Sequence, residues 1–295
     1  MKSLSGETLK AHAAMLLFAF LVSTSFTVGR SITFLLDPGP LTFMRFVMAV
    51  AIFSLVALLS KERFSWPTVA NWLRYFFLAL LLVIFFVTMF EGLRWSTPLA
   101  SGAVFTLVPF MTAIIGFAIF RQSMALAGFL ALVVAGLASL WIMFGGNLAA
   151  IMSLQLGRGE AIFLVGCAAY AGYAPAVKKF NTGSLVYMTF WTLVAGTILL
   201  LIFQWPNITS TKWHLASSLT YLAIAWLALF TTAITFYLIN YAALRLPSVK
   251  VMSYTLLIPA FILLQRVVNG GIWPSASVLA ALAVLFGSML VLQRV

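Results

Sequence analysis

Apolar residues occur along this chain in ten long runs, which are separated by short stretches of polar residues, glycine and proline. Each run approaches the length of about 20 residues that a helix needs to cross a bilayer. Within a run such as 76–90 the apolar residues are nearly continuous, whereas the strands of a membrane barrel would alternate. The pattern predicts ten membrane-spanning helices. Their expected bounds are 11–28, 41–60, 73–90, 99–120, 125–144, 161–177, 186–204, 219–239, 249–267 and 277–292.

The second half of the chain repeats features of the first half. Pro109 lies in the middle of the fourth span and Pro259 in the middle of the ninth, and about half of the 295 residues separate them. Gly136 and Gly287 have a similar separation. The chain is therefore expected to consist of two copies of one five-helix unit, 1–147 and 148–295.

A unit with five crossings ends on the other side of the membrane, so the second copy must enter from the side opposite to the first. The expected fold class is an all-α polytopic membrane protein with ten transmembrane helices, arranged as two inverted five-helix repeats. Helix interruptions at matching places in inverted repeats are typical of secondary transporters, which bind their substrates near the bilayer midplane.

Composition and charge agree with a membrane protein. Hydrophobic residues make up 64% of the chain and charged residues 7%, with a mean hydropathy of +1.13, whereas a soluble domain has about 25% charged residues. The net charge of +12 is spread over the connectors, without a basic tail that would indicate a nucleic-acid partner. With the N-terminus in the cytoplasm, the cytoplasmic connectors hold about twice as many Lys and Arg residues as the others. Both termini are therefore expected on the cytoplasmic side of the inner membrane.

Motifs for catalysis or metal binding are absent from the sequence. The only histidines, His12 and His214, lie far apart, and Cys167 is the single cysteine. Zinc needs a cluster of such ligands, so we expect no metal, no cofactor and no disulfide within the chain. The first run is long and lacks a small-residue cleavage site, and we interpret it as a permanent span rather than a signal peptide.

Several short motifs occur together with these spans. They are Arg45-Phe46 in the second span, 103–110 in the fourth, 135–137 in the fifth, 168–171 in the sixth and 256–259 in the ninth. In this combination the chain resembles the EamA-type transporters of the drug/metabolite transporter superfamily over nearly its whole length. The resemblance implies secondary transport of small metabolites, often export, through a central cavity lined by spans 1, 3, 4, 6, 8 and 9.

The chain departs from the pattern of that family at three places. Similar proteins commonly carry a Gly-Glu pair just after the fourth and ninth spans, where this chain has Arg121-Gln122 and Val268-Asn269. A tryptophan usual in the first span is replaced here by Ser25-Phe26. Because of the first two differences, a gating contact made by that acid does not carry over to this chain. Because of the third, a substrate specificity does not carry over either.

Polar and aromatic residues at mid-depth are the candidates for the cavity wall, because each is costly in contact with lipid. The prolines also free the carbonyl groups of Phe105 and Thr255, four residues earlier. The alternative for the prolines is a kink that only serves helix packing. The alternative for the polar residues is a hydrogen bond that only joins two helices. The candidate cavity residues are Ser23, Thr27, Phe86, Phe105, Pro109, Tyr170, Tyr173, Tyr237, Asn240, Tyr254 and Pro259. Their aromatic members favour flat apolar or aromatic solutes.

Three ionisable residues are expected near the outer side of the membrane, namely Arg30, Arg45 and Glu91. In one hypothesis, Glu91 pairs with Arg45 or Arg30 to form an outer gate or to handle a coupling proton. In another, the arginines attract a substrate carboxylate. In a third, purely structural one, Arg45 lies only about 6 Å deep and extends its side chain to the headgroups.

These observations predict a secondary transporter that exports small metabolites such as amino acids across the cytoplasmic membrane by alternating access, as a monomer or homodimer. The expected partners are the lipid bilayer and a small-molecule substrate. A facilitative channel or exchanger is the main alternative, since no acidic residue near the bilayer centre is available to relay protons. A membrane enzyme is the least favoured one.

Overall fold

The computed structural model describes residues 6–60, 66–153 and 157–294. These residues contain ten helical spans that are long and apolar enough to cross a membrane, in agreement with the sequence prediction. The uninterrupted spans are α1 (Gly6–Ile32), α2 (Pro38–Leu59), α3 (Val69–Trp95), α6 (Leu126–Met143), α10 (Leu185–Ser210) and α15 (Ala276–Arg294).

The other spans are each built from consecutive shorter helices. The fourth is α4 (Pro98–Phe105) with α5 (Val108–Phe120), and the sixth is α8 (Arg158–Ala171) with α9 (Tyr173–Lys179). The eighth contains α11 (Ser218–Ala228), the π-helix η2 (Leu229–Ile234) and α12 (Thr235–Ala243). The ninth contains α13 (Ser248–Ser253), the 3₁₀ turn η3 (Tyr254–Leu257) and α14 (Ile258–Val268). Two short helices lie in connectors, α7 (Leu148–Met152) and η1 (Trp213–Leu215).

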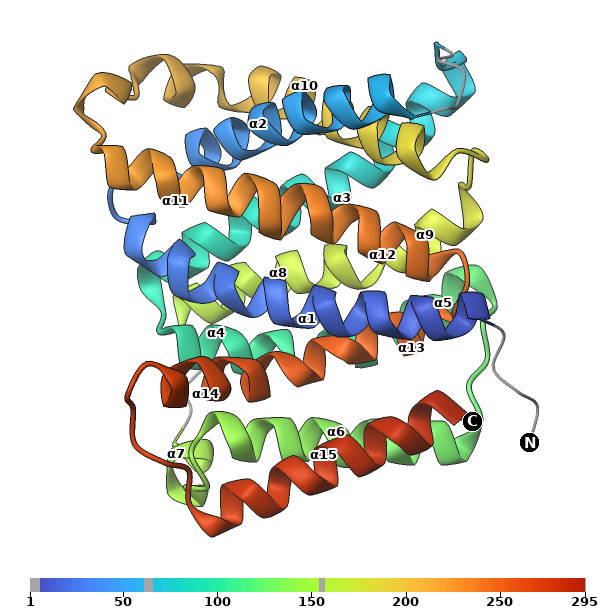
Figure 1. Ribbon diagram of the computed structural model, residues 1–295, viewed down its shortest axis with the longest axis vertical. Coiled ribbons are helices and arrows are strands. Elements are labelled where there is room, and N and C mark those ends of the chain that lie inside the picture. The colour runs from blue at the N-terminus through green and yellow to red at the C-terminus, as the bar shows by residue number, and fades with distance from the viewer. Residues whose placement is uncertain (1–5, 61–65, 154–156, 295) are drawn as a thin grey trace.

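The spans lie side by side with their axes roughly along one direction, which is horizontal in Figure 1. The pair α2 and α10 packs at one end of the row and the pair α6 and α15 at the other, and the remaining spans lie between them. The two ends of the described chain lie on the same side of the bundle. We call this side the terminal face, and the other side the opposite face.

Contacts between spans are paired in a way that reflects the repeat. Helix α3, the third span, packs on α8 of the sixth span, and correspondingly α12 of the eighth span packs on α1. Likewise α10 contacts α3 while α2 contacts α11, and α4 contacts α8 while α14 contacts α1. Exchanging the two halves therefore maps each contact onto another one, as expected for inverted repeats. The boundary between residues 147 and 148 stays a prediction.

Both central prolines interrupt their helices, as predicted. Helix α4 ends at Phe105 and α5 begins at Val108, directly before Pro109. In the ninth span the turn η3 ends at Leu257, and α14 begins one residue before Pro259. Proline lacks a donor for the helix ladder and its ring collides with the preceding turn, so each helix restarts with proline in its first turn.

The interruptions of the sixth and eighth spans were not predicted. In the sixth, Pro175 lies early in α9 and cannot bond to the carbonyl of Ala171, which instead accepts a hydrogen bond from the Thr112 hydroxyl at 3.0 Å. In the eighth, the π-helix η2 contains no proline or glycine. A hydroxyl of a neighbouring span thus replaces the backbone bond that Pro175 removes.

One connector of the sequence prediction was placed wrongly. Residues 205–207 were expected to follow the seventh span, but α10 continues through them to Ser210 and contains Pro206. A single proline removes only one backbone bond, and a long helix bends around it rather than ending.

Glycines bring α3 and α8 into backbone contact. A Cβ added at Gly159 would lie 2.6 Å from the carbonyl oxygen of Gly92, and one added at Gly92 would lie 2.8 Å from that of Gly159. Two turns further along α8, a Cβ at Gly166 would collide with the side chain of Thr88. Close approach at small residues is the usual way in which membrane helices gain packing energy.

Candidate functional site

Aromatic side chains form a buried column between the central spans. The column consists of Phe26 of α1, Phe85 and Phe86 of α3, Phe105 of α4, Phe163 and Tyr170 of α8, and Phe236 of α12. Phe85 stacks on Tyr170 with 4.3 Å between ring centroids, and the ring of Phe105 lies 5.7 Å from that of Phe85. Phe86 stacks on Phe236 at 5.8 Å. Phe105 is the last residue of α4, so the interruption before Pro109 lies directly beside the column.

A polar network lies beside the column toward the terminal face. The Tyr173 hydroxyl donates to Oδ1 of Asn240 at 2.8 Å, and Nδ2 of Asn240 donates to the hydroxyl of Thr189 at 3.0 Å. All three side chains are buried. The network joins the sixth, eighth and seventh spans, and the rings of Tyr173 and Tyr170 are parallel at 6.4 Å. Buried polar groups in a membrane need such partners.

Arg45 is a third buried feature of the central spans. Its side chain has no exposed surface, and Nη2 donates to the hydroxyls of Thr231 at 3.1 Å and Thr232 at 2.8 Å. The guanidinium also lies over the rings of Phe86 and Phe90, at 4.5 and 5.2 Å from their centroids. The prediction that Arg45 extends to the headgroups is therefore wrong. Helix α2 begins at Pro38 rather than near 41, so Arg45 lies about 10 Å along the helix from its start.

The remaining candidate cavity residues are spread over several places. Ser23 accepts a hydrogen bond from Gln265 at 2.5 Å, and the Tyr254 hydroxyl lies 2.8 Å from Nδ1 of His12. Tyr237 is half-buried, and its ring lies 6.5 Å from that of Tyr241. Thr27 is exposed on α1. Thus Phe86, Phe105, Tyr170, Tyr173 and Asn240 lie together, and these other side chains do not join them.

The two central prolines are both buried in their spans. Pro259 also lines an apolar pocket of about 770 Å³ with residues of α6, α14 and the segment before α15, among them Ile262, Arg266 and Trp273. This pocket lies on the half of the bundle nearer the opposite face.

The charged residues predicted for an outer gate do not pair with one another. Glu91 lies 3.5 Å from Arg94 and accepts a hydrogen bond from Trp95 at 2.9 Å. Arg30 donates to the backbone carbonyls of Leu93 and Ser96. Over the described ranges, no salt bridge joins Glu91 to Arg45 or Arg30. The predicted pairing was wrong because residues three apart on one helix, Glu91 and Arg94, meet without any rearrangement.

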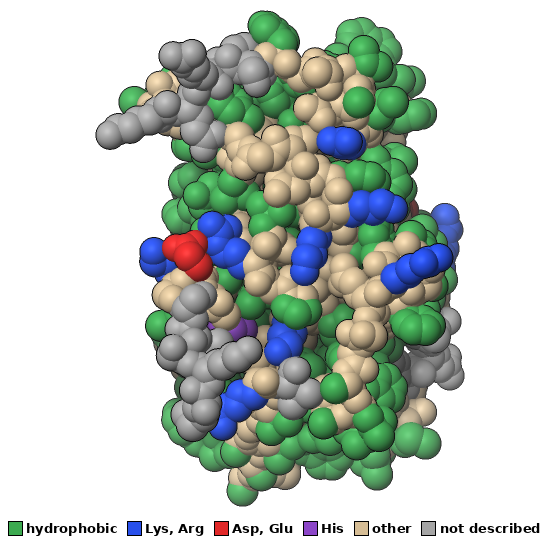
Figure 2. Space-filling model, turned by 90° about the vertical axis from the view of Figure 1, so that its right-hand side faces the viewer, with side chains coloured by type: hydrophobic (Ala, Val, Ile, Leu, Met, Phe, Trp, Pro, Cys, Tyr) green, Lys and Arg blue, Asp and Glu red, His purple; other side chains and the backbone are tan. Residues whose placement is uncertain are grey.

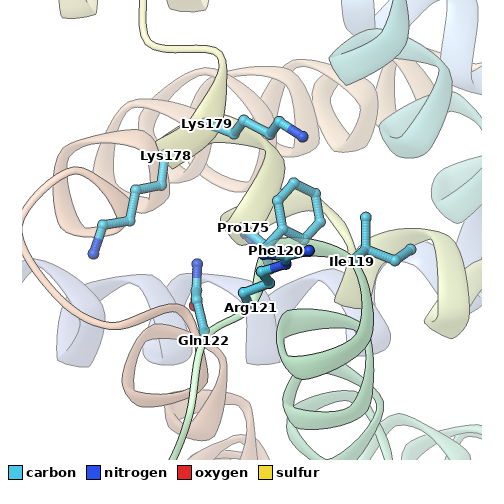
Figure 3. A pocket seen from close by; sticks show the side chains of 7 residues that line it. All are labelled: Ile119, Phe120, Arg121, Gln122, Pro175, Lys178 and Lys179. Carbon is cyan, nitrogen blue, oxygen red and sulfur yellow. The ribbon is translucent and has the colours of Figure 1, made fainter.

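Basic side chains gather at the terminal face. Figure 2 views this face, on which Lys and Arg side chains greatly outnumber acidic ones. Between the ends of α5 and α9 these residues surround a pocket of about 550 Å³, shown in Figure 3, which sequence analysis did not identify. Its lining includes Arg121, Gln122, Lys178 and Lys179. Arg121 adopts a left-handed backbone conformation with φ 52°, which glycine adopts more readily.

Two sets of five crossings, whose contacts are exchanged between the halves around interrupted helices and a buried aromatic core, define an inverted-repeat membrane protein. The model of the EamA-like transporter family matches residues 9–144 and 157–293, once in each half. The chain belongs to the EamA-like transporter family, which confirms the resemblance in the sequence. It is thus a membrane transporter, and the match favours transport over enzymatic activity.

Two similar proteins extend this result. The chain is 21% identical over 289 residues to "Uncharacterized transporter YyaM" of Bacillus subtilis (strain 168), covering 95% of this chain and 92% of the relative. A chain described only as "Crystal structure of protein" has the same fold, with a TM-score of 0.73 at 19% identity, and the match covers 99% of this chain and 98% of that one.

Proposed function

We propose that the protein is a secondary transporter that exports small metabolites such as amino acids across the cytoplasmic membrane by alternating access. The main support is the symmetry of the packing around the aromatic column, in which contacts between spans have a counterpart when the two halves are interchanged. Halves related in this way have two similar packings, in which the centre opens to one side or to the other. Within this proposal the cavity is lined by Phe86, Phe105, Tyr170, Tyr173 and Asn240, and the two halves are 1–147 and 148–295.

The orientation proposed places the terminal face in the cytoplasm. Support comes from the basic residues that crowd this face, because cytoplasmic connectors carry an excess of Lys and Arg. Glu7 on this face is paired with Lys10 and Arg245, at 3.1 and 2.9 Å. A monomer or a homodimer would present the same face to the cytoplasm.

Counterflow in proteoliposomes tests the proposal. Vesicles that hold the purified full chain are loaded with unlabelled amino acids and diluted into a trace of the same labelled amino acid. An alternating-access carrier gives a transient accumulation of label, because each return step is faster with substrate bound. A channel gives only equilibration, which would contradict alternating access, and no passage of any amino acid would contradict the substrate class. Repeating the uptake with an imposed pH gradient separates proton-coupled transport from the facilitative alternative.

Tyr170 offers a test of the aromatic column. Replacing it with alanine removes the ring stacked on Phe85, so we expect a KM for aromatic amino acids raised about threefold to tenfold, in line with about 1 kcal/mol for an aromatic contact. Tyr173→Ala should act in the same direction. Tyr221→Ala, in the exposed part of α11, is the control and should leave KM unchanged. Unchanged uptake by the Tyr170 variant would remove the column from the transport path.

Glu91 offers a test of the gating hypothesis. We expect Glu91→Gln to alter the pH dependence of transport, because it removes the carboxylate that holds Arg94 and Trp95 at the opposite face. Initial rates are measured between pH 5 and 8, with Asp37→Asn, at the other partner of Arg94, as the control. Identical profiles for the wild type and the Glu91 variant would dismiss a gating role.

A further inference from the structure

Arg45 is a buried charge without a counter-ion. The salt bridges of the residues described here involve Glu7, Asp37 and Glu91, and none of them reaches Arg45. The hydrogen-bond and ring partners of its guanidinium are neutral, namely two threonines and two phenylalanine rings. An arginine inside the membrane is expensive, and such residues commonly mark a substrate or ion pathway.

The guanidinium of Arg45 also has unused donors. Nε and Nη1 are buried and have no hydrogen-bond partner among the described residues, whereas Nη2 makes all three hydrogen bonds of the group. Nε and Nη1 each form a fork with Nη2, and a carboxylate that displaces one threonine from Nη2 accepts two parallel hydrogen bonds in either fork. Leaving charged donors unpaired in a low-dielectric interior is unfavourable, so the site is suited to an anionic acceptor.

The surroundings of Arg45 indicate what the rest of such a ligand would be. The Phe86 ring lies over the guanidinium and stacks on Phe236, and it also contacts Phe85 at 5.0 Å, which leads into the aromatic column. The cation is therefore adjacent to flat apolar surfaces rather than to further polar groups. A solute with a carboxylate at one end and a flat apolar body would match both parts.

The helix opposite Arg45 is itself irregular. Thr231 and Thr232 lie in the π-helix η2, and both of their hydroxyls donate to the carbonyl of Leu227 at 3.0 Å. Nη2 of Arg45 also approaches the backbone carbonyl of Thr231 at 3.4 Å. Single π-turns within α-helices frequently occur at functional sites. Arg45 therefore connects α2 to the one π-helical segment among the residues that the structure describes.

We propose that Arg45 binds the carboxylate of an aromatic or flat apolar solute, whose body lies against Phe86 and the aromatic column. This inference rests on the proposed transport function and names the substrate class of that same site. Arg45 lies in the second span, outside the spans that the family resemblance assigns to the cavity. In the opposing interpretation Arg45 only holds η2 in place, and the acid or base character of a solute would not matter.

A series of probes that differ only in their ionic groups tests this proposal. The full chain in lipid nanodiscs is titrated with 3-phenylpropanoate, L-phenylalanine and L-phenylalaninamide, and binding is followed by the midpoint of thermal unfolding. We expect both carboxylates to raise the midpoint and to bind about tenfold more tightly than the amide, because a site built to hydrogen-bond a group rejects the analogue that lacks it. Equal affinity for acid and amide in the wild type, or no effect of either carboxylate, overturns the proposal without any variant.

Variants then assign the preference to Arg45. Arg45→Gln should abolish the difference between acid and amide, and Arg45→Lys, which keeps the charge but not the fork, should retain only part of it. Arg94→Gln is the matched control, because Arg94 lies at the opposite face and pairs with Asp37 and Glu91. A folded Arg45→Gln protein that still prefers the acids overturns the proposal.

The same probes separate this inference from the proposed transport function. Counterflow of the amide that does not depend on Arg45 would leave a carrier but contradict the carboxylate site. Carboxylate-selective binding that is lost in Arg45→Gln, without counterflow of any probe, would support the site and contradict the carrier.

Discussion

Replacing Gly159 with alanine is expected to destabilise the protein by about 1–3 kcal/mol, the usual cost of forcing an extra methyl group into packed surroundings. The added Cβ would lie 2.6 Å from the Gly92 carbonyl oxygen and 2.9 Å from the backbone nitrogen of Ser96. Both are backbone atoms, so no side chain can turn away to make room. The helices α3 and α8 would have to separate, which would also disturb the stacking of Phe85 on Tyr170.

Gly287 in α15 provides the matched control for this experiment. A Cβ added there meets no atom within 4 Å, and alanine is favoured over glycine in a helix by about 1 kcal/mol. The two substitutions should thus shift the midpoint of thermal unfolding in opposite directions, downward for Gly159→Ala and upward or not at all for Gly287→Ala. Equal midpoints for the two variants would show that the close contact of α3 and α8 is not important for stability.

Replacing both Pro109 and Pro259 with alanine is expected to lower the transport rate about tenfold, which corresponds to a barrier raised by about 1.4 kcal/mol. Alanine restores a backbone donor for the carbonyls of Phe105 and Thr255, and it removes the ring that prevents a continuous helix. The fourth and ninth spans would then straighten, and Phe105 would leave its place beside Phe85 and Tyr170. The rate of counterflow in proteoliposomes is the measurement.

The seventh span provides a control for the proline pair. Pro206 lies within α10 but is exposed near its end, so Pro206→Ala should leave counterflow intact. Because alanine is the better helix former by about 3 kcal/mol, the double variant should be at least as stable as the wild type. Normal counterflow by a stable double variant would contradict a role of the interrupted helices in transport.

Much of the fold follows directly from the sequence. Long apolar runs define the spans because only apolar segments whose backbone groups bond internally are stable in the hydrocarbon core. Pro109 and Pro259 mark two interruptions because proline has no backbone donor. The interruption of the sixth span was not predicted although Pro175 lies there, because the first span, its counterpart in the other half, contains no proline. The π-helix in the eighth span has no comparable signal, because neither proline nor glycine occurs in Leu229–Ile234.

The candidate site was predictable only in part. Phe86, Phe105, Tyr170, Tyr173 and Asn240 do lie together, since polar and aromatic residues at mid-depth avoid lipid. Whether these residues bind a substrate stays a prediction. Thr27 is exposed instead, because the polar residues of the first span are too closely spaced to define one face of its helix. Ion pairs such as Glu91 with Arg94 depend on side-chain direction, which depth along a span does not specify.

The single positive charge of Arg45 also has an electrical consequence. No basic residue occurs in α10, the counterpart of α2 in the second half, so the two halves differ in charge within the membrane. Moving one elementary charge across the whole membrane involves about 2.3 kcal/mol for each 100 mV of potential. In the proposed alternating-access cycle, a displacement of α2 along the membrane normal would therefore perform electrical work, and the voltage across the bilayer would favour one of the two packings over the other.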